Sequence, residues 1–171
     1  MRVEAPIKVD RKTKKLAKRL STGDIAVINH TDIDEVAANS LVECKIKLVI
    51  NAAPSISGRY PNKGPKILID NNILIIDNVG EKVFEDLKEG QIIEVNNGLI
   101  YRDGQLIGQG DVMDKSVVEQ KTKIAYENMS VELDRFIDNT IEYAKREKGF
   151  ILGETEIPKM ATDYKDRHVL V

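Results

Sequence analysis

Residues 51–65, NAAPSISGRYPNKGP, gather the side chains of this chain that are best suited to hold a ligand. Glycine lets backbone N–H groups approach an anion, and Arg and Lys add charge and hydrogen bonds. Loops at the carboxyl ends of strands in α/β sheets are common binding sites. We therefore predict a site for a phosphorylated small molecule or a protein partner, made by Ser55, Ser57, Gly58, Arg59, Tyr60, Asn62, Lys63 and Gly64.

A structural role explains the same composition. Pro54, Pro61 and Pro65 would rigidify the loop without any ligand. Tyr60, which precedes Pro61, could pack over the sheet edge. Both interpretations stay open at the level of the sequence.

Patterns for catalysis or metal binding are absent from the sequence. His30 and His168 lie far apart, and no C-x-x-C, H-x-x-x-H or G-x-S-x-G motif occurs. Gly58 to Gly64 is not a P-loop, because Lys63 comes one position too early and Gly64 replaces the Ser or Thr. We predict no catalytic residue and no metal site; an enzyme acting through residues 54–64 is the alternative.

The composition suits a soluble domain with a core. Hydrophobic residues make up 42% of the 171, and the net charge is −2, which argues against a dedicated nucleic-acid binder. No apolar run is long enough for a membrane span or a signal peptide, so we expect a cytoplasmic protein. Six cations in residues 11–20 predict a solvated basic helix or, alternatively, a contact with an anionic surface.

Apolar periodicity and turn residues predict an α/β domain. Strands are expected at 23–29, 47–50 and 73–77, with three more in a meander over 91–108 whose NNG and DG turns suit tight hairpins. Helices are expected at 31–45, 65–72 and 81–90. The first of these should be capped by Thr31 or Asp32. Its predicted core stripe is Ile33, Val36, Ala37, Leu41 and Cys44, with Cys44 as a buried filler.

Residues 116–148 predict one long helix, starting at a capping box from Ser116 and free of Gly and Pro. Such a helix would be roughly 50 Å long, more than a small domain covers. We predict a homodimer through its apolar stripe, which comprises Val118, Ala125, Met129, Leu133, Phe136, Ile137, Thr140 and Ile141. Coverage by a further domain is the alternative.

Two stretches carry resemblances to known families. GDIAVINHTDIDEV, NNILIIDNVG and LKEGQIIEVNNGLIYRDG, within residues 23–104, resemble the phosphohistidine swivelling domain of phosphoenolpyruvate-utilising enzymes. That resemblance implies a swivelling-type β/β/α domain with a mixed sheet, followed here by the long helix. The family's phosphorylated histidine is missing, because SISGRYPNKG stands in its place.

The whole chain also resembles the N-terminal part of SteA-like cytokinetic-ring proteins of bacteria. The resemblance rests on NAAPSISGRYPNKGP, VDRKTKKLAKRL, NTIEYAKRE and DYKDRHVLV. It implies a non-catalytic binding or assembly module with a partner in septation or envelope growth. It further implies a thiamine-pyrophosphokinase-like domain beyond residue 171, with ATP and magnesium, and a tail that tethers the longer protein to the membrane. No cofactor site is visible in these 171 residues.

The expected organisation has four parts. Residues 1–21 form a basic arm or helix, 22–112 the swivelling-like domain, and 113–148 the long helix. Residues 149–171 form a linker and the first strand of a truncated second domain.

Overall fold

The computed structural model describes residues 2–154 and contains eight strands and six helices in that range. The strands are β1 (Arg2–Val9), β2 (Ile25–Ile28), β3 (Leu48–Asn51), β4 (Leu74–Asp77), β5 (Ile92–Asn96), β6 (Leu99–Arg102), β7 (Gln105–Gln109) and β8 (Asp111–Met113). The helices are α1 (Thr13–Ala17), α2 (Glu35–Glu43), α3 (Gly64–Asp70), α4 (Glu81–Asp86), α5 (Lys115–Arg146) and α6 (Lys148–Ile151). The chain divides into two compact units at Val131, within α5. The strand predicted near residue 171 lies outside the described residues.

All eight strands belong to one mixed sheet in the order β7-β6-β5-β1-β2-β3-β4-β8. Neighbouring strands from β1 to β4 are parallel, with a helix between each pair along the chain, while β5 to β8 pair antiparallel. The α/β class, the mixed sheet and the long helix predicted from the sequence are confirmed.

The sheet curls until its two edges meet. β7 and β8 stand at opposite ends of the strand order, yet only Gly110 separates them along the chain. A Cβ atom on Gly110 would lie 2.5 Å from the carbonyl oxygen of Asp77 at the end of β4, so only glycine fits at this junction between β7 and β8. One apolar cluster joins side chains from β1 to β6 with Phe84 of α4. A second cluster joins the other face of β2, β3 and β4 to α1, α2, α3 and the start of α5.

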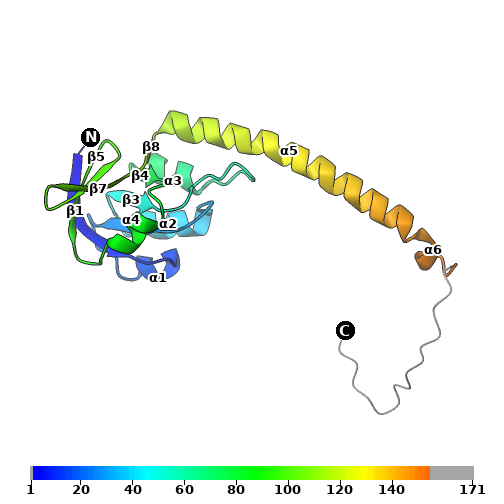
Figure 1. Cartoon of the computed structure of the whole chain (residues 1–171), viewed down its shortest axis with the longest axis horizontal. Helices are drawn as coiled ribbons and strands as arrows, with labels where there is room; N and C mark the ends of the chain where they lie inside the picture. Colours follow the sequence, from blue (N-terminus) through cyan, green and yellow to red (C-terminus); the bar gives the residue numbers. More distant parts are fainter. Residues whose placement is uncertain (1, 155–171) are drawn as a thin grey trace, which may run out of the picture. The chain divides into compact units, whose positions relative to one another are not determined.

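The prediction of a basic arm or helix over residues 1–21 is wrong for residues 2–9. They form β1 in the middle of the sheet, parallel to β2 and antiparallel to β5 (Figure 1). Ala5 and Ile7 are buried, and they alternate with exposed residues as in a half-buried strand. Only the segment after β1 matches the expectation, since α1 is a short basic helix.

The start of α2 differs from the prediction. Asp34 is the N-cap, and its carboxylate accepts a hydrogen bond from the Ala37 N–H at 2.7 Å. This later start turns Val36 outward, where it is 76% exposed, and brings Ala38 into the core. Thr31 and Asp32 lie in the preceding loop, which frees the Asp32 carboxylate for another partner.

Helix α5 starts at Lys115, one residue before the predicted Ser116. The Asp114 carboxylate accepts from the Val117 N–H at 2.8 Å, so Asp114 does the capping. Val118 and Ala125 are buried within the chain itself, and Val118 belongs to the core beneath α3. These two residues are therefore unavailable to a second copy, which corrects that part of the predicted dimer stripe.

Candidate functional site

Three buried polar residues tie the loop after β3 to the sheet. Asn51 at the end of β3, Ser55 in the loop and Asp77 at the end of β4 are each fully buried. The Ser55 hydroxyl donates to Asp77 Oδ1 at 2.6 Å and accepts from Asn51 Nδ2 at 2.8 Å. The Ser55 N–H also donates to the same carboxylate, at 2.9 and 3.0 Å from its two oxygens. Ser55 is thus a structural bridge and is inaccessible to a ligand or substrate.

Burial raises the pKa of the Asp77 carboxyl above its ordinary value. Removal from water is the dominant cause, and the nearby Asp111 charge adds to it. The two hydrogen bonds from Ser55 and the charge of Lys121 act in the opposite direction. The carboxyl has its partners inside the fold, so the raised pKa reflects its burial and gives no sign of acid–base catalysis.

The neighbouring strand ends are linked in the same way. Asn51 exchanges two hydrogen bonds with the backbone of His30, which follows β2. The His30 ring nitrogen Nδ1 lies 3.0 Å from the hydroxyl of Thr13, the first residue of α1. One buried amide and one imidazole therefore connect β2, β3 and α1 at the carboxyl edge of the sheet.

The loop does hold an anion, and that anion is the carboxylate of Asp32. The Ser57 N–H donates to Asp32 Oδ1 at 2.6 Å, and the Ser57 hydroxyl donates to Oδ2 at 2.8 Å. The Ser57 Oγ in turn accepts from the Arg59 N–H. The groups predicted to bind phosphate at Ser57 are therefore occupied by a side chain 25 residues earlier in the chain.

Asn62 and Gly64 close the loop against the start of α2. The Asn62 amide donates to the carbonyl oxygens of Ile33 and Ser55, at 2.9 and 2.8 Å. A Cβ on Gly64 would lie 2.1 Å from the Ile33 carbonyl oxygen. The backbone at residue 64 therefore lies so close to the backbone of Ile33 that only glycine fits there. These two predicted site residues hold the loop in place.

The remaining predicted residues face solvent. Arg59 is exposed and Tyr60 is 60% exposed, and no ion pair or hydrogen bond of the Arg59 guanidinium occurs within residues 2–154. Lys63 lies 3.2 Å from Glu35, with both side chains largely exposed. The carbonyl of Gly58 accepts from the Asn128 amide of α5 at 2.8 Å. The structure thus splits the predicted site into internal supports and a short outer tip of three residues.

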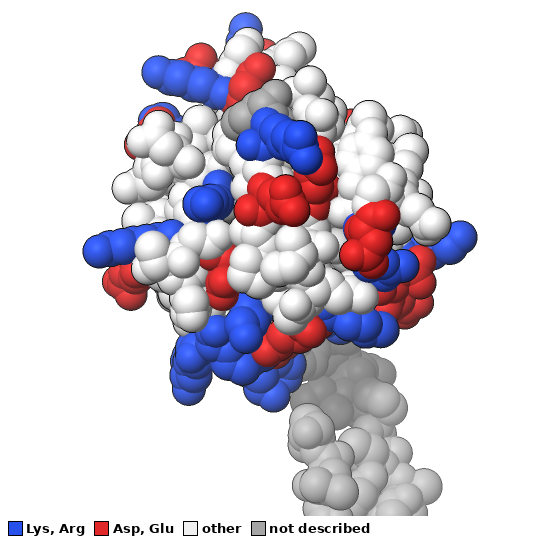
Figure 2. Space-filling model, turned by 90° about the vertical axis from the view of Figure 1, so that its left-hand side faces the viewer, with Lys and Arg blue, Asp and Glu red and all other residues white. Residues whose placement is uncertain are grey.

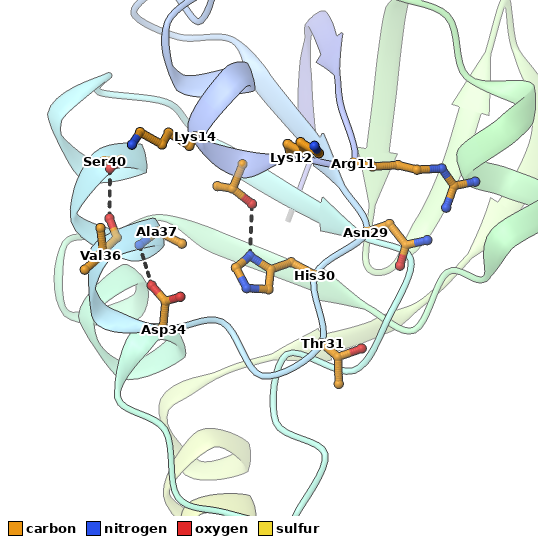
Figure 3. A pocket seen from close by; sticks show the side chains of 11 residues that line it. Arg11, Lys12, Lys14, Asn29, His30, Thr31, Asp34, Val36, Ala37 and Ser40 are labelled. Atoms are coloured by element: carbon orange, nitrogen blue, oxygen red, sulfur yellow. Dashed lines mark hydrogen bonds between the residues drawn. The ribbon is translucent and has the colours of Figure 1, made fainter. Parts of the chain in front are cut away.

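A cavity of about 460 Å³ lies between the β2–α2 loop and the segment that opens α1 (Figure 3). Residues 11–14, 29–31, 34, 36, 37 and 40 line it, so it lies where β2 ends and where α1 and α2 begin. Lys12 and Lys14 bring positive charge, and the exposed Val36 with Ala37 brings an apolar wall. The sequence analysis missed this cavity, although every lining segment directly follows a strand or opens a helix.

The basic segment around α1 supplies the cations of the cavity. Figure 2 shows Lys and Arg side chains gathered along the lower edge of the domain, where Figure 1 places α1. Arg11 forms ion pairs with Glu81 and Glu85, and its guanidinium lies 4.9 Å from the centre of the Phe84 ring. Arg19 pairs with Asp10 and Glu89, and it is the largest cause of the lowered pKa of Glu89. Both arginines thus anchor this segment to the sheet and to α4.

Cys44 lacks the surroundings of a reactive thiol. It is half-buried, and its Sγ donates to the carbonyl oxygens of Ser40 and Ala17. Burial, followed by the charge of Glu43, raises the pKa of the thiol, which disfavours the nucleophilic thiolate. Within residues 2–154, no three His, Cys, Asp or Glu side chains are grouped so that they could hold a metal ion.

The outer part of α5 carries the other predicted surface. Met129, Leu133, Phe136, Ile137 and Ile141 are between 37% and 66% exposed. The Thr140 hydroxyl donates back to the Phe136 carbonyl at 2.7 Å. Across the described helices, none is apolar enough over a sufficient length to cross a membrane. Charged residues interrupt the apolar stripe on α5. Within residues 132–154, no helix or strand covers this stripe.

Comparisons with known proteins leave the function open. No protein-family profile matches the chain, and no curated protein is similar to it. Among solved structures, a 3-isopropylmalate dehydratase from Methanocaldococcus jannaschii is similar over 79% of this chain and 99% of its own. Its sequence identity is 12% and its TM-score is 0.41, so the likeness carries no argument about activity.

Proposed function

We propose that this chain is a non-catalytic binding and assembly module of a bacterial septation protein and that it acts in the cytoplasm. The observation that carries the proposal is the exposed apolar stripe of α5, formed by side chains such as Leu133 and Phe136. Large apolar groups in a row on one helix face are typical of protein–protein contacts.

The polar centre of the domain supports a module that does not catalyse. Its best-placed hydroxyl, Ser55, is fully buried and hydrogen-bonded, and Asp32 already occupies the anion position at Ser57. A catalytic nucleophile needs access to substrate and a free base within hydrogen-bond reach. Ser55 has no access to substrate, the carboxylate beside Ser57 is already held by two hydrogen bonds from Ser57, and the raised pKa of the Cys44 thiol disfavours its thiolate.

The septation part of the proposal is supported by the sequence of the loop. Residues 51–65 resemble the SteA-like cytokinetic-ring proteins over a long and specific stretch. In the longer protein implied by that resemblance, a thiamine-pyrophosphokinase-like domain with ATP and magnesium follows residue 171, and a tail tethers it to the membrane. The present domain would then supply contacts with the division apparatus and not chemistry.

Localisation tests this function directly. A fluorescent fusion of the full-length protein, expressed from its own locus, should gather at the division site in constricting cells. A Phe136→Asp fusion should lose that enrichment. An Asp138→Asn fusion should keep it, because Asp138 lies on the face of α5 opposite the stripe. Uniform cytoplasmic fluorescence of the unaltered fusion throughout the cell cycle would reject a role in septation.

The cavity beside α1 favours a second candidate function, binding of a small phosphorylated ligand. Lys12 and Lys14 provide charge and Thr31 a hydroxyl, whereas Thr13 and Asn29 already bond to His30 and Glu81. Titration calorimetry with inorganic phosphate and with nucleoside monophosphates tests it. Saturable binding that is lost in Lys12→Ala and kept in Arg59→Ala would place the ligand in the cavity and not at the loop tip.

A further inference from the structure

We propose that α5 pairs with α5 of a second copy of this chain in an antiparallel coiled coil with its midpoint at residue 138. This inference rests on the proposed assembly function and names its first partner. It concerns the part of the helix between Glu132 and Arg146, which belongs to the second compact unit.

The spacing of the exposed side chains indicates a helix-pairing seam. Met129, Leu133, Phe136, Thr140 and Tyr143 follow each other at alternating steps of four and three residues. This is the spacing of the core positions in a left-handed coiled coil. Leu133, Phe136 and Tyr143 are 53%, 66% and 59% exposed, so no element of the described range 2–154 covers the seam.

Thr140 fits an apolar seam because its hydroxyl is already satisfied. Its Oγ1 donates to the Phe136 carbonyl of the same helix at 2.7 Å. A buried hydroxyl without a partner would be costly, whereas this one keeps its hydrogen bond when the seam is covered.

Side-chain sizes favour the antiparallel direction. With the midpoint at 138, residues equally far from it face each other, so Phe136 packs on Thr140 of the second copy and Leu133 packs on Tyr143. Each layer then combines a larger side chain with a smaller one, which fills space evenly. A parallel pair in register would place Phe136 on Phe136 and Thr140 on Thr140, with one crowded layer next to one thin layer.

Charge favours the same direction. Glu132 and Arg146 lie on one flank of the seam, six residues before and eight residues after the midpoint, and in an antiparallel pair their long side chains reach each other across this small offset. Within one copy, Arg146 lies 3.4 Å from Glu147 and 5.3 Å from the centre of the Tyr143 ring, and Glu132 lies 2.9 Å from Arg135. These charged side chains are exposed, so Glu132 and Arg146 can also meet a second copy. A parallel pair would instead set Glu132 beside Ile137, leaving the carboxylate without a cation from the second copy.

Cysteine pairing tests the direction and the register. In a Cys44→Ala background, Leu133→Cys chains mixed with Tyr143→Cys chains should give disulfide-linked heterodimers on mild oxidation. Each variant alone should give few, because Leu133 does not face Leu133. Homodimer cross-linking by each variant alone, without the mixed product, would overturn the antiparallel pairing in favour of a parallel one.

A charge swap tests the flanking contact in the full 171-residue chain. Glu132→Arg and Arg146→Glu should each weaken dimerisation by about tenfold, and the double variant should restore it to within a few-fold. The matched control is Asp138→Arg, which makes the same charge change on the opposite face and should leave the dissociation constant within about twofold. Absence of rescue in the double variant would refute the proposed register.

Light scattering separates this inference from the proposed function. A strictly monomeric chain at high concentration would overturn the helix pairing and would show that another occupant covers α5. Enrichment at the division site would still stand in that case, since a different protein could bind the same stripe. A dimer with the predicted disulfides but no enrichment would sustain the pairing and reject the septation role.

Discussion

The loop between β3 and α3 and the outer half of α5 differ in what their side chains contact. In the loop, the hydroxyls of Ser55 and Ser57 donate to the carboxylates of Asp77 and Asp32, and the amide nitrogen of Asn62 donates to backbone carbonyls, all within the same compact unit. On α5, Leu133 and Phe136 expose more than half of their surface. The residue types of the loop predicted a binding site, yet most of its polar groups bond within the fold, whereas the large apolar side chains on α5 remain exposed.

The difference shows that residue types alone do not identify a site. Polar groups that reach each other inside a fold stabilise it, because each buried donor or acceptor without a partner is costly. Apolar side chains that remain in water have the opposite effect and favour association.

Gly64→Ala should destabilise the domain most. Its Cβ would meet the carbonyl oxygens of Ile33 and Asp34 at 2.1 and 2.8 Å, and both are backbone atoms at the start of α2. We expect a loss of about 3 kcal/mol or more in the free energy of unfolding, measured by urea denaturation. Gly104→Ala is the control, because nothing lies within 4 Å of its Cβ and only its φ of 76° opposes the change. Equal effects of the two substitutions would show that the loop does not close tightly on α2.

Ser55→Ala should have the next largest effect. It removes the hydroxyl between Asn51 and Asp77 and leaves a buried carboxylate with one donor fewer. The expected loss is about 1–3 kcal/mol in the free energy of unfolding. Ser116→Ala, at an exposed position in α5, should change it by less than about 0.5 kcal/mol. A Ser55→Ala domain as stable as the unaltered one would contradict the structural role of this network.

Asp77 should make stability depend on pH in a defined direction. Its pKa in the folded domain is raised above the ordinary 3.8, so between these two values the folded state is protonated and the unfolded state is ionised. The folded state therefore binds more protons, and the free energy of unfolding falls as pH rises through this window. Asp77→Asn lacks this titration.

The measurement compares urea denaturation of both proteins between about pH 4 and pH 7. As the pH rises toward 7, the free energy of unfolding of the wild-type domain should fall relative to that of the Asp77→Asn variant. A shift in favour of the wild-type domain would mean that the pKa of Asp77 is lowered, and that the Ser55 hydrogen bonds outweigh burial.

Phe136→Asp should have the smallest effect on the stability of the single chain. The side chain is 66% exposed, so at dilute, monomeric concentration the free energy of unfolding should change by less than about 0.5 kcal/mol. The same substitution places two carboxylates in the seam of the helix pair and should abolish dimerisation in light scattering. A large loss of monomer stability would mean that Phe136 packs within its own chain, which would remove the contrast with the loop.

Much of the fold could be predicted from local patterns. The branched residues of β4, the hairpin turns between β5, β6 and β7 and the uninterrupted stretch of α5 each have a short-range sequence signal. β1 was missed because Pro6 and the charged residues Glu4 and Lys8 hide its alternation. The start of α2 was misplaced because Thr31, Asp32 and Asp34 are all good caps, and only the packing of Ala38 in place of Val36 distinguishes them.

The sequence by itself determined most of the elements and their order, the absence of catalytic and metal motifs from the sequence, and the apolar stripe of α5, because each depends on residues close together in the chain. Only the tertiary structure decided which groups of the predicted loop remain free. Asp32 reaches Ser57, and Ser55 reaches Asp77, because parallel strands end at the same edge of the sheet and bring together residues more than twenty positions apart. Such pairings leave no periodicity in the sequence. The same meeting of strand ends and helix starts formed the cavity beside α1, whose lining residues carry no local pattern of their own.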